Sequence, residues 1–202
     1  GRFAQVAAQP LLARDVDVSI IENDVEMIQA ASQFGFKVYY GDGAQLSTLR
    51  ASGAEEAEIV LVCVDKPEVT DRIVELVKHE FPRTRVMARA FDRGHSIRLI
   101  QAGVDYQIRE TFESALKFGE EALIELGRPE EAASETIGDV RRRDEARLDL
   151  QLTGGLSAGR QLMRGNMPTP QPAPYVVPRR KGRLLNEDEA GPPAPAEPEP
   201  VD

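Results

Sequence analysis

Tryptophan is absent from the 202-residue sequence, and aromatic residues make up only 5% of it. Because 41% of the residues are hydrophobic, a core can still form, but aliphatic side chains must fill most of it. The single cysteine, Cys63, lies in the apolar run 59–64 and has no partner for an internal disulfide, which fits a reducing compartment. We interpret Cys63 as a core residue rather than a reactive thiol.

Positive charge is also scarce, since 25 Lys and Arg residues face 34 Asp and Glu residues, for a formal net charge of −9. This balance argues against nucleic acid as a partner and against docking on anionic lipid. One cysteine and two histidines are too few for an ordinary zinc site. No apolar run reaches the roughly 18 residues that suggest a membrane span. The chain opens without Met, and we expect it to be a fragment of a longer polypeptide.

Short β-branched runs alternate with segments of helical periodicity over the first 108 residues. The predicted strands are 16–21, 36–40, 59–64, 85–88 and 104–107. The predicted helices between them are 3–14, 24–34, 45–52, 67–80 and 93–102. This alternation predicts βαβ units and a Rossmann-like, doubly wound parallel α/β sheet whose first strand would lie upstream.

Composition divides the chain into three parts. The nucleotide-binding domain is predicted at 1–127 and ends with an amphipathic helix, 112–126, for which Thr111 is a candidate N-cap. Residues 128–152 form a charged helical extension. Ten of the 14 prolines lie between 168 and 200, so we predict a disordered tail over 153–202.

The start of the chain resembles half of a phosphate-binding glycine motif. In the pattern G-x-G-x-x-G/A, Gly1 fits the second glycine and Ala4 fits the third position. The motif predicts an acid about 20 residues later that accepts the ribose hydroxyls, and Glu22 follows the predicted strand 16–21. A tight turn followed by an ordinary N-cap acid is the alternative interpretation. Pro10 is expected to kink or shorten the first helix.

Three further residues fall where ligands bind in open α/β sheets, after the carboxyl ends of strands. Asp42 and Asp65 could contact base or ribose, and Arg89 could hold phosphate or a second anionic ligand; turn formation or surface charge is the alternative for each. No nucleophile arrangement surrounds His79 or His95, which we predict to be surface residues. We therefore predict no catalytic residues, no metal site and no enzymatic activity.

Several strings resemble one known family in the same order along the chain: Gly1–Gln5, Phe36–Asp42, Ala88–Ala90, Gln101–Val104 and Arg109–Leu116. Together they resemble the RCK/KTN (TrkA-N) domain of Kef-type, glutathione-regulated potassium-efflux antiporters. The similarity covers about residues 1–127.

The resemblance implies a cytoplasmic regulatory domain that gates an inner-membrane potassium/proton antiporter carried by the same chain. It implies a homodimer to which helix 112–126 contributes, allows an ancillary subunit, and makes AMP or NAD(H) the regulatory ligand. Motif and resemblance together predict that the nucleotide contacts Gly1, Arg2, Phe3, Ala4, Glu22, Asp24, Gly41, Asp42, Asp65 and Arg89.

Two departures concern glutathione. Phe91 stands where the family often has a second arginine, and Glu145 stands where it can have an asparagine. Phe91 removes a charge-assisted hydrogen bond to a carboxylate, and Glu145 would repel the anionic tripeptide, although Arg2 remains as a contact. We therefore expect nucleotide binding more than glutathione gating.

Two other functions stay open on this sequence. A soluble potassium-uptake subunit of Trk or Ktr type would normally continue into a β-rich second domain. An NAD-dependent oxidoreductase would need a substrate domain with proton-transfer residues.

Overall fold

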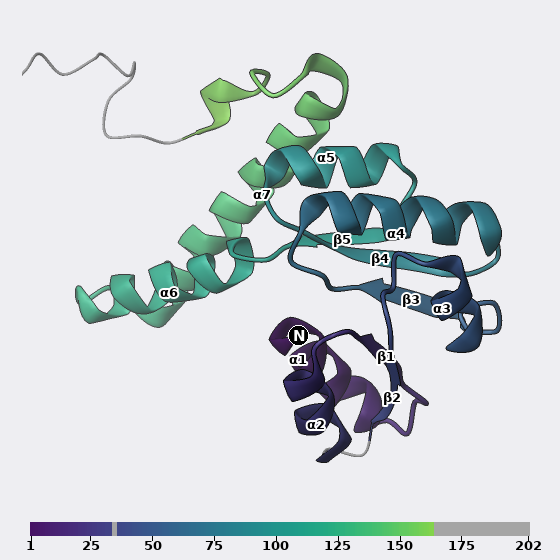
Figure 1. Cartoon of the computed structure of the whole chain (residues 1–202). Helices are drawn as coiled ribbons and strands as arrows, with labels where there is room; N and C mark the ends of the chain where they lie inside the picture. Colours follow the sequence, from purple (N-terminus) through teal and green to yellow (C-terminus); the bar gives the residue numbers. More distant parts are fainter. Residues whose placement is uncertain (34–35, 164–202) are drawn as a thin grey trace, which may run out of the picture. The chain divides into compact units, whose positions relative to one another are not determined.

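The computed structural model describes residues 1–33 and 36–163, without the side chains of 30–33, and these residues belong to one compact unit, Gly1–Arg164. Strands and helices alternate as predicted (Figure 1). The strands are β1 Ser19–Glu22, β2 Lys37–Tyr40, β3 Ile59–Val62, β4 Arg85–Ala90 and β5 Tyr106–Arg109. The helices are α1 Arg2–Leu12, α2 Val25–Gln33, α3 Leu46–Ala51, α4 Pro67–Glu80, α5 Arg93–Gln101, α6 Phe112–Glu125 and α7 Glu130–Gly154, followed by a short 3-10 helix, η1, at Arg160–Leu162.

The strands are all parallel but form two separate sheets. β1 pairs with β2, and β3, β4 and β5 pair in that order. Among the described residues, one edge of β1 and one edge of β3 have no strand partner. In the Rossmann strand order these two edges flank the position of the first strand. The arrangement is therefore that of a doubly wound sheet with its first position empty, as the sequence predicts.

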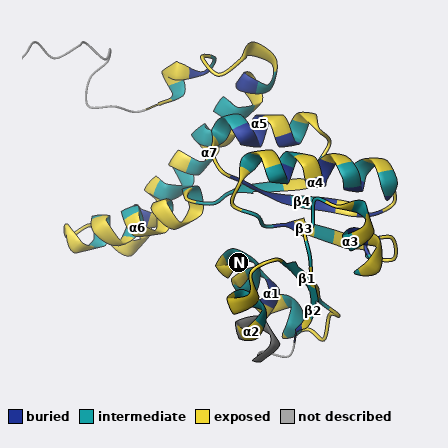
Figure 2. Cartoon of the chain, viewed as in Figure 1, coloured by how far each residue is buried: buried dark blue, intermediate teal, exposed yellow. Residues whose placement is uncertain are grey.

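An aliphatic core lies between the three-stranded sheet and its helices (Figure 2). Val74 and Val77 of α4, Val86 of β4 and Leu99 of α5 are fully buried. Each such side chain stabilises the fold by about 1.5–3 kcal/mol relative to exposure. Phe81 is the aromatic member of this core. A smaller cluster around Ala8 and Phe36 packs α1 against β1 and β2.

Pro10 does not end the first helix where it occurs. α1 includes Pro10 and continues to Leu12, after which Asp15 adopts a positive φ of 55°. A proline at this position removes one i→i−4 hydrogen bond, and with only two helical residues left the loss affects the last turn alone.

The ordered part of the chain extends further than predicted. α7 runs to Gly154, and glycines at 155 and 159 with positive φ lead into η1. The prediction of disorder from residue 153 onward is therefore wrong over 153–163, because this segment packs back on α7. The rest of that predicted tail, 164–202, lies outside the described residues.

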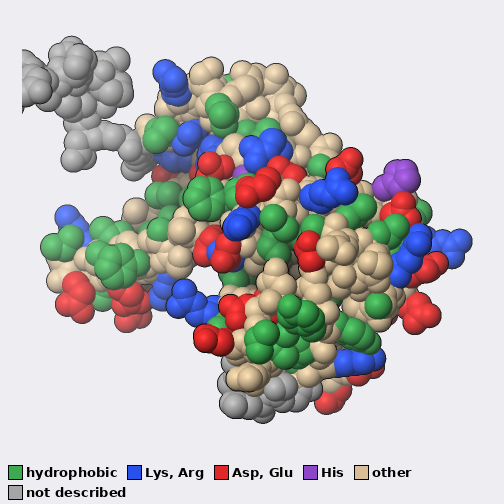
Figure 3. Space-filling model, viewed as in Figure 1, with side chains coloured by type: hydrophobic (Ala, Val, Ile, Leu, Met, Phe, Trp, Pro, Cys, Tyr) green, Lys and Arg blue, Asp and Glu red, His purple; other side chains and the backbone are tan. Residues whose placement is uncertain are grey.

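α6 lies against α7 but buries none of its own residues. Phe118 is 80% exposed and Leu126 79% exposed. Hydrophobic side chains accordingly reach the surface over α6, where acidic and basic side chains lie beside them, and hydrophobic side chains are exposed elsewhere on the face shown as well (Figure 3). Among the described residues, no helix is both long and apolar enough to cross a membrane.

Candidate functional site

The first turn of α1 and the end of β1 meet, as the motif spacing predicts. The Gly1 nitrogen donates to Glu22 Oε2 at 2.6 Å, while Glu22 Oε1 accepts from the backbone nitrogens of Asn23 (3.0 Å) and Asp24 (3.3 Å). Gly1 is the N-cap of α1, and no side chain caps the helix. The backbone amides of Arg2, Phe3 and Ala4 therefore form an uncapped helix N-terminus, which is a favourable place for an anion.

Two predicted ligand residues cap their own elements. Asp24 Oδ1 accepts from the amides of Glu26 (2.9 Å) and Met27 (3.3 Å), so it caps the N-terminus of α2. Asp42 Oδ1 accepts from the Ala44 amide at 2.9 Å and closes the turn after β2. These contacts use one oxygen of each carboxylate.

Gly41 begins that turn for a steric reason. Its amide donates to the Glu22 carbonyl at 3.0 Å, which ties the turn to β1. A Cβ at this position would lie 2.7 Å from Thr48 Cγ2, so any other residue would require the Thr48 side chain or the turn to shift. Gly41 therefore holds Asp42 and Glu22 at neighbouring strand ends.

Arg89 is more fully engaged than the sequence predicts. Its residue is 9% exposed, and the guanidinium donates to Asp65 Oδ1 (2.5 Å), the Cys63 carbonyl (3.3 Å) and Glu110. It also lies over the Phe3 ring, 5.1 Å from the centroid. Burial alone would lower the pKa of Arg89, but hydrogen bonds to Glu110 and Asp65 outweigh it and raise that pKa.

The structure therefore brings Phe3, Asp65 and Arg89 together and adds Glu110, which sequence reasoning missed. Glu110 directly follows β5, so the rule that selected Asp65 after β3 would also have found it. Because three acceptors already surround Arg89, it joins the ends of β3, β4 and β5 rather than offering a free cation.

The prediction of a surface position is wrong for His95. This residue is 2% exposed; its Nδ1 accepts from the Phe91 amide at 3.0 Å, and its Nε2 lies 3.0 Å from Asp71 Oδ1. Because a backbone amide can only donate, His95 Nδ1 is the acceptor of this hydrogen bond. Nε2 therefore carries the ring proton and donates a hydrogen bond to Asp71. His79, in contrast, has an exposed side chain, as predicted.

Cys63 behaves as a packed thiol. It is half-buried, and burial, opposed more weakly by the Arg89 charge, raises its pKa to about 11. The thiol is therefore protonated at neutral pH and is a poor nucleophile. Among the described residues no group of three or more His, Cys, Asp or Glu side chains is placed to hold a metal ion.

Comparison with known proteins assigns the chain to a family. The sequence model of the TrkA-N domain matches residues 1–110, more than half of the chain. The chain belongs to the TrkA-N domain family. A Haemophilus influenzae protein named "Glutathione-regulated potassium-efflux system protein" is 37% identical over 188 residues, 93% of this chain and 30% of that protein. The KefC protein of Salmonella arizonae, of the same system, is 44% identical over 127 residues, 63% of this chain and 20% of that protein.

A solved structure supports the assignment. The Kef C-terminal domain of Shewanella denitrificans in its AMP-bound form is 35% identical, with a TM-score of 0.69 over 75% of this chain and 92% of that one. This TrkA-N chain thus spans less than a third of the length of each of the two curated relatives but nearly all of this solved domain.

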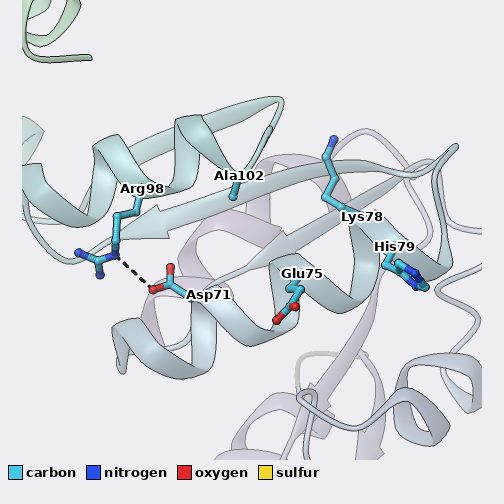
Figure 4. Close-up of a pocket in the computed structure, with 6 residues that line it drawn as sticks. All are labelled: Asp71, Glu75, Lys78, His79, Arg98 and Ala102. Atoms are coloured by element: carbon cyan, nitrogen blue, oxygen red, sulfur yellow. Dashed lines mark hydrogen bonds and ion pairs between the residues drawn. The ribbon is translucent and has the colours of Figure 1, made fainter. Parts of the chain in front are cut away.

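An open hollow lies elsewhere in the described part of this TrkA-N domain, between α4 and α5 (Figure 4). It is an open space of about 550 Å³ lined by Asp71, Glu75, Lys78, His79, Arg98 and Ala102. None of the ten predicted nucleotide contacts lines it. Its charges are mixed, and Asp71 Oδ2 pairs with Arg98 Nε at 3.4 Å across it.

Proposed function

We propose that this chain is the nucleotide-binding regulatory domain of a potassium-efflux system, with AMP or NAD(H) as its regulatory ligand. The observation that carries the proposal is the uncapped N-terminus of α1 beside the Glu22 carboxylate, whose Oε1 is held by the Asn23 and Asp24 amides. It is supported by the AMP that the Shewanella denitrificans domain is described as binding, at 35% identity.

In this proposal the phosphate lies at the α1 N-terminus and the ribose lies at Glu22. The amides of Arg2, Phe3 and Ala4 donate to phosphate oxygens, and the exposed Arg2 side chain adds a positive charge. Glu22 Oε1 stays with the Asn23 and Asp24 amides, while Oε2, which accepts from the terminal ammonium of Gly1 in this structure, accepts the ribose hydroxyls instead. A carboxylate at this position disfavours a nucleotide that carries a 2′-phosphate.

The remaining predicted contacts have supporting roles in the same site. Gly41 and Asp42 shape the turn beside Glu22, and Asp24 orients α2. Asp65 is exposed, so its second carboxylate oxygen is available to base or ribose. Arg89 holds Asp65 and the Phe3 ring in place, and in this arrangement it is a positioning residue rather than the phosphate ligand.

Regulation requires that the nucleotide bind one arrangement of the domain more tightly than another, because only differential affinity shifts an equilibrium. We propose that the domain acts as a homodimer on the cytoplasmic side of the inner membrane and gates a cation:proton antiporter in the same polypeptide. The relatives' names support the transport system, and the exposed apolar residues of α6 support a dimer. Phe91 is exposed and Glu145 is acidic and exposed, so neither supplies the donors that glutathione would need.

Calorimetric titration of the intact protein with AMP, ATP, NAD and NADH, with and without glutathione, tests the proposal. Glu22→Gln removes the charged acceptor, and we expect it to weaken nucleotide binding about tenfold or more, since a hydrogen bond to a charged group contributes about 1.5–3 kcal/mol. Glu26→Gln, an exposed neighbour in the first turn of α2, is the matched control and should change the dissociation constant less than twofold. The nucleotide role fails if none of the four ligands binds below millimolar concentration.

A further inference from the structure

An excess of buried positive charge gathers where α5, β5 and α7 meet. Arg93 at the start of α5 and Arg109 at the end of β5 both donate to Asp144 of α7. The side chains of Arg93, Asp144 and Arg109 are only 13–14% exposed. Arg109 also stacks on Phe112, 3.9 Å from the ring centroid.

A third guanidinium in this cluster has no acid of its own. Arg147, one turn along α7 from Asp144, forms no ion pair with any described residue, and its Nε is buried without a hydrogen-bond partner. The nearby acids are already used, because Glu113 pairs with Arg141 at 2.6 Å and Asp139 pairs with Arg143 at 2.8 Å. Arg93 and Arg109 therefore share the single carboxylate of Asp144 while Arg147 has none, so the three arginines and Asp144 together carry a formal charge of +2.

The positive charges of this cluster repel one another. Burial, and then the charges of Arg109 and Arg147, lower the pKa of Arg93 to about 10. Burial and the charge of Arg147 also lower the pKa of Arg109. Cations at this density in a partly buried position are stabilised by an anion that accepts from the free donors.

A cavity of about 220 Å³ opens beside the cluster and gives such an anion room. Its lining combines Arg143, Asp144 and Arg147 with the apolar side chains of Val140, Leu162 and Met163. The volume is below the range of drug-sized ligand pockets, about 300–1,000 Å³, and so suits a small ion. Planar guanidinium forks bind carboxylate and phosphate oxygens in pairs.

We propose that this cavity binds a small, doubly charged oxyanion through Arg147, with Arg93 and Arg109 supplying the surrounding positive field. The charge of the ligand follows from the formal charge of +2 left on the three arginines and Asp144, and a dicarboxylate or inorganic phosphate both meet this requirement. Binding ties α7 and η1 to α5 and β5, so it acts on the helical extension rather than on the nucleotide edge.

Thermal unfolding of the intact protein with succinate and with phosphate, each compared with chloride at equal ionic strength, provides the test. We expect a saturable rise in Tm with at least one of the two anions, and the one that acts at lower concentration identifies the ligand class. Arg147→Gln should raise the dissociation constant at least tenfold. Arg142→Gln removes the same charge from a largely exposed position on α7 and should leave it within twofold.

Unfolding without ligand provides a second readout. If Arg147 is an unpaired cation, Arg147→Gln relieves repulsion and its Tm at low salt should equal or exceed that of the unaltered protein. A lower Tm, together with an unchanged anion response, would mean that Arg147 only packs the helix and would overturn the proposal. So would a response that succinate and phosphate share equally with chloride.

AMP also carries a phosphate, so its binding is measured in the same variants. Arg147→Gln should keep its affinity for AMP, and Glu22→Gln should keep its response to succinate or phosphate. If the anion response fails while AMP still binds, only the oxyanion site is refuted; if AMP fails while the anion response persists, only the proposed nucleotide site is refuted.

Discussion

Arg89 illustrates how one side chain connects three strand ends. It lies in β4, reaches Asp65 and the Cys63 carbonyl after β3, and reaches Glu110 after β5. A buried guanidinium is stable here because both of its terminal nitrogens find acceptors. The surrounding acids belong to separate loops, so losing Arg89 would leave like charges facing one another at the edge proposed to bind the nucleotide.

Arg89→Met should lower the free energy of unfolding by about 2 kcal/mol, because it removes several charge-assisted hydrogen bonds and leaves Glu110 unpaired. The measurement is urea unfolding followed by circular dichroism. Arg85→Met in the same strand is the control, since Arg85 is exposed and its nearest acid, Glu58, is 3.9 Å away; we expect a change within about 0.5 kcal/mol. Equal effects of the two substitutions would contradict the role given to Arg89.

His95, like Arg89, is buried by contacts with residues from other elements. Its ring is held between the Phe91 amide and Asp71 of α4, so it orients the end of β4 relative to α5. Neither partner adjoins it in a recognisable motif. A histidine near a helix start gives no sign in sequence that the neighbouring helix will cover it.

The N-cap residues of the helices differ in whether their side chains accept a hydrogen bond from a backbone amide of the first turn. Asp92 precedes α5 with extended backbone and accepts from the His95 amide at 2.8 Å. Thr111 precedes α6 at the predicted position, but its backbone is helical and its side chain makes no capping bond. The position of a cap is thus visible in sequence, while its energy depends on the local backbone conformation.

We therefore expect Asp92→Ala to destabilise the protein by about 1 kcal/mol, the usual contribution of a bonded N-cap. Thr111→Ala should change stability by less than about 0.5 kcal/mol because no hydrogen bond is lost. Chemical denaturation of both variants, with identical buffers, measures the difference. A Thr111→Ala effect as large as that of Asp92→Ala would show that α6 is capped differently in solution.

At the scale of the whole molecule, two surfaces remain incompletely covered. The unpaired edges of β1 and β3 flank one strand position of the Rossmann order, and α6 exposes Phe118 and Leu126. Exposed apolar side chains on one helix are unfavourable in a monomer because they contact water. In an oligomer they stabilise the assembly, because association removes them from water. This is the structural support for α6 as the dimer contact.

Phe118→Glu should dissociate the proposed homodimer, since a charge in an apolar interface loses its hydration without gaining a partner. Light scattering coupled to size-exclusion chromatography of the intact protein measures the molecular mass. Leu156→Glu, at an exposed apolar residue that follows α7, should leave the mass unchanged. If both variants remain dimeric, the dimer forms through another surface.

The sequence alone determined the order and type of the elements, the aliphatic core, the position of Glu22 at the end of β1, and the family. These follow from local periodicity, from turn residues and from a motif whose spacing is set by one βαβ unit. The tertiary structure decided which charged and polar groups meet. Arg89 with Asp65, His95 with Asp71 and Arg93 with Asp144 join residues 24, 24 and 51 positions apart. Such contacts depend on how separate helices and strands pack, and no local pattern in the chain encodes which side chains that packing buries.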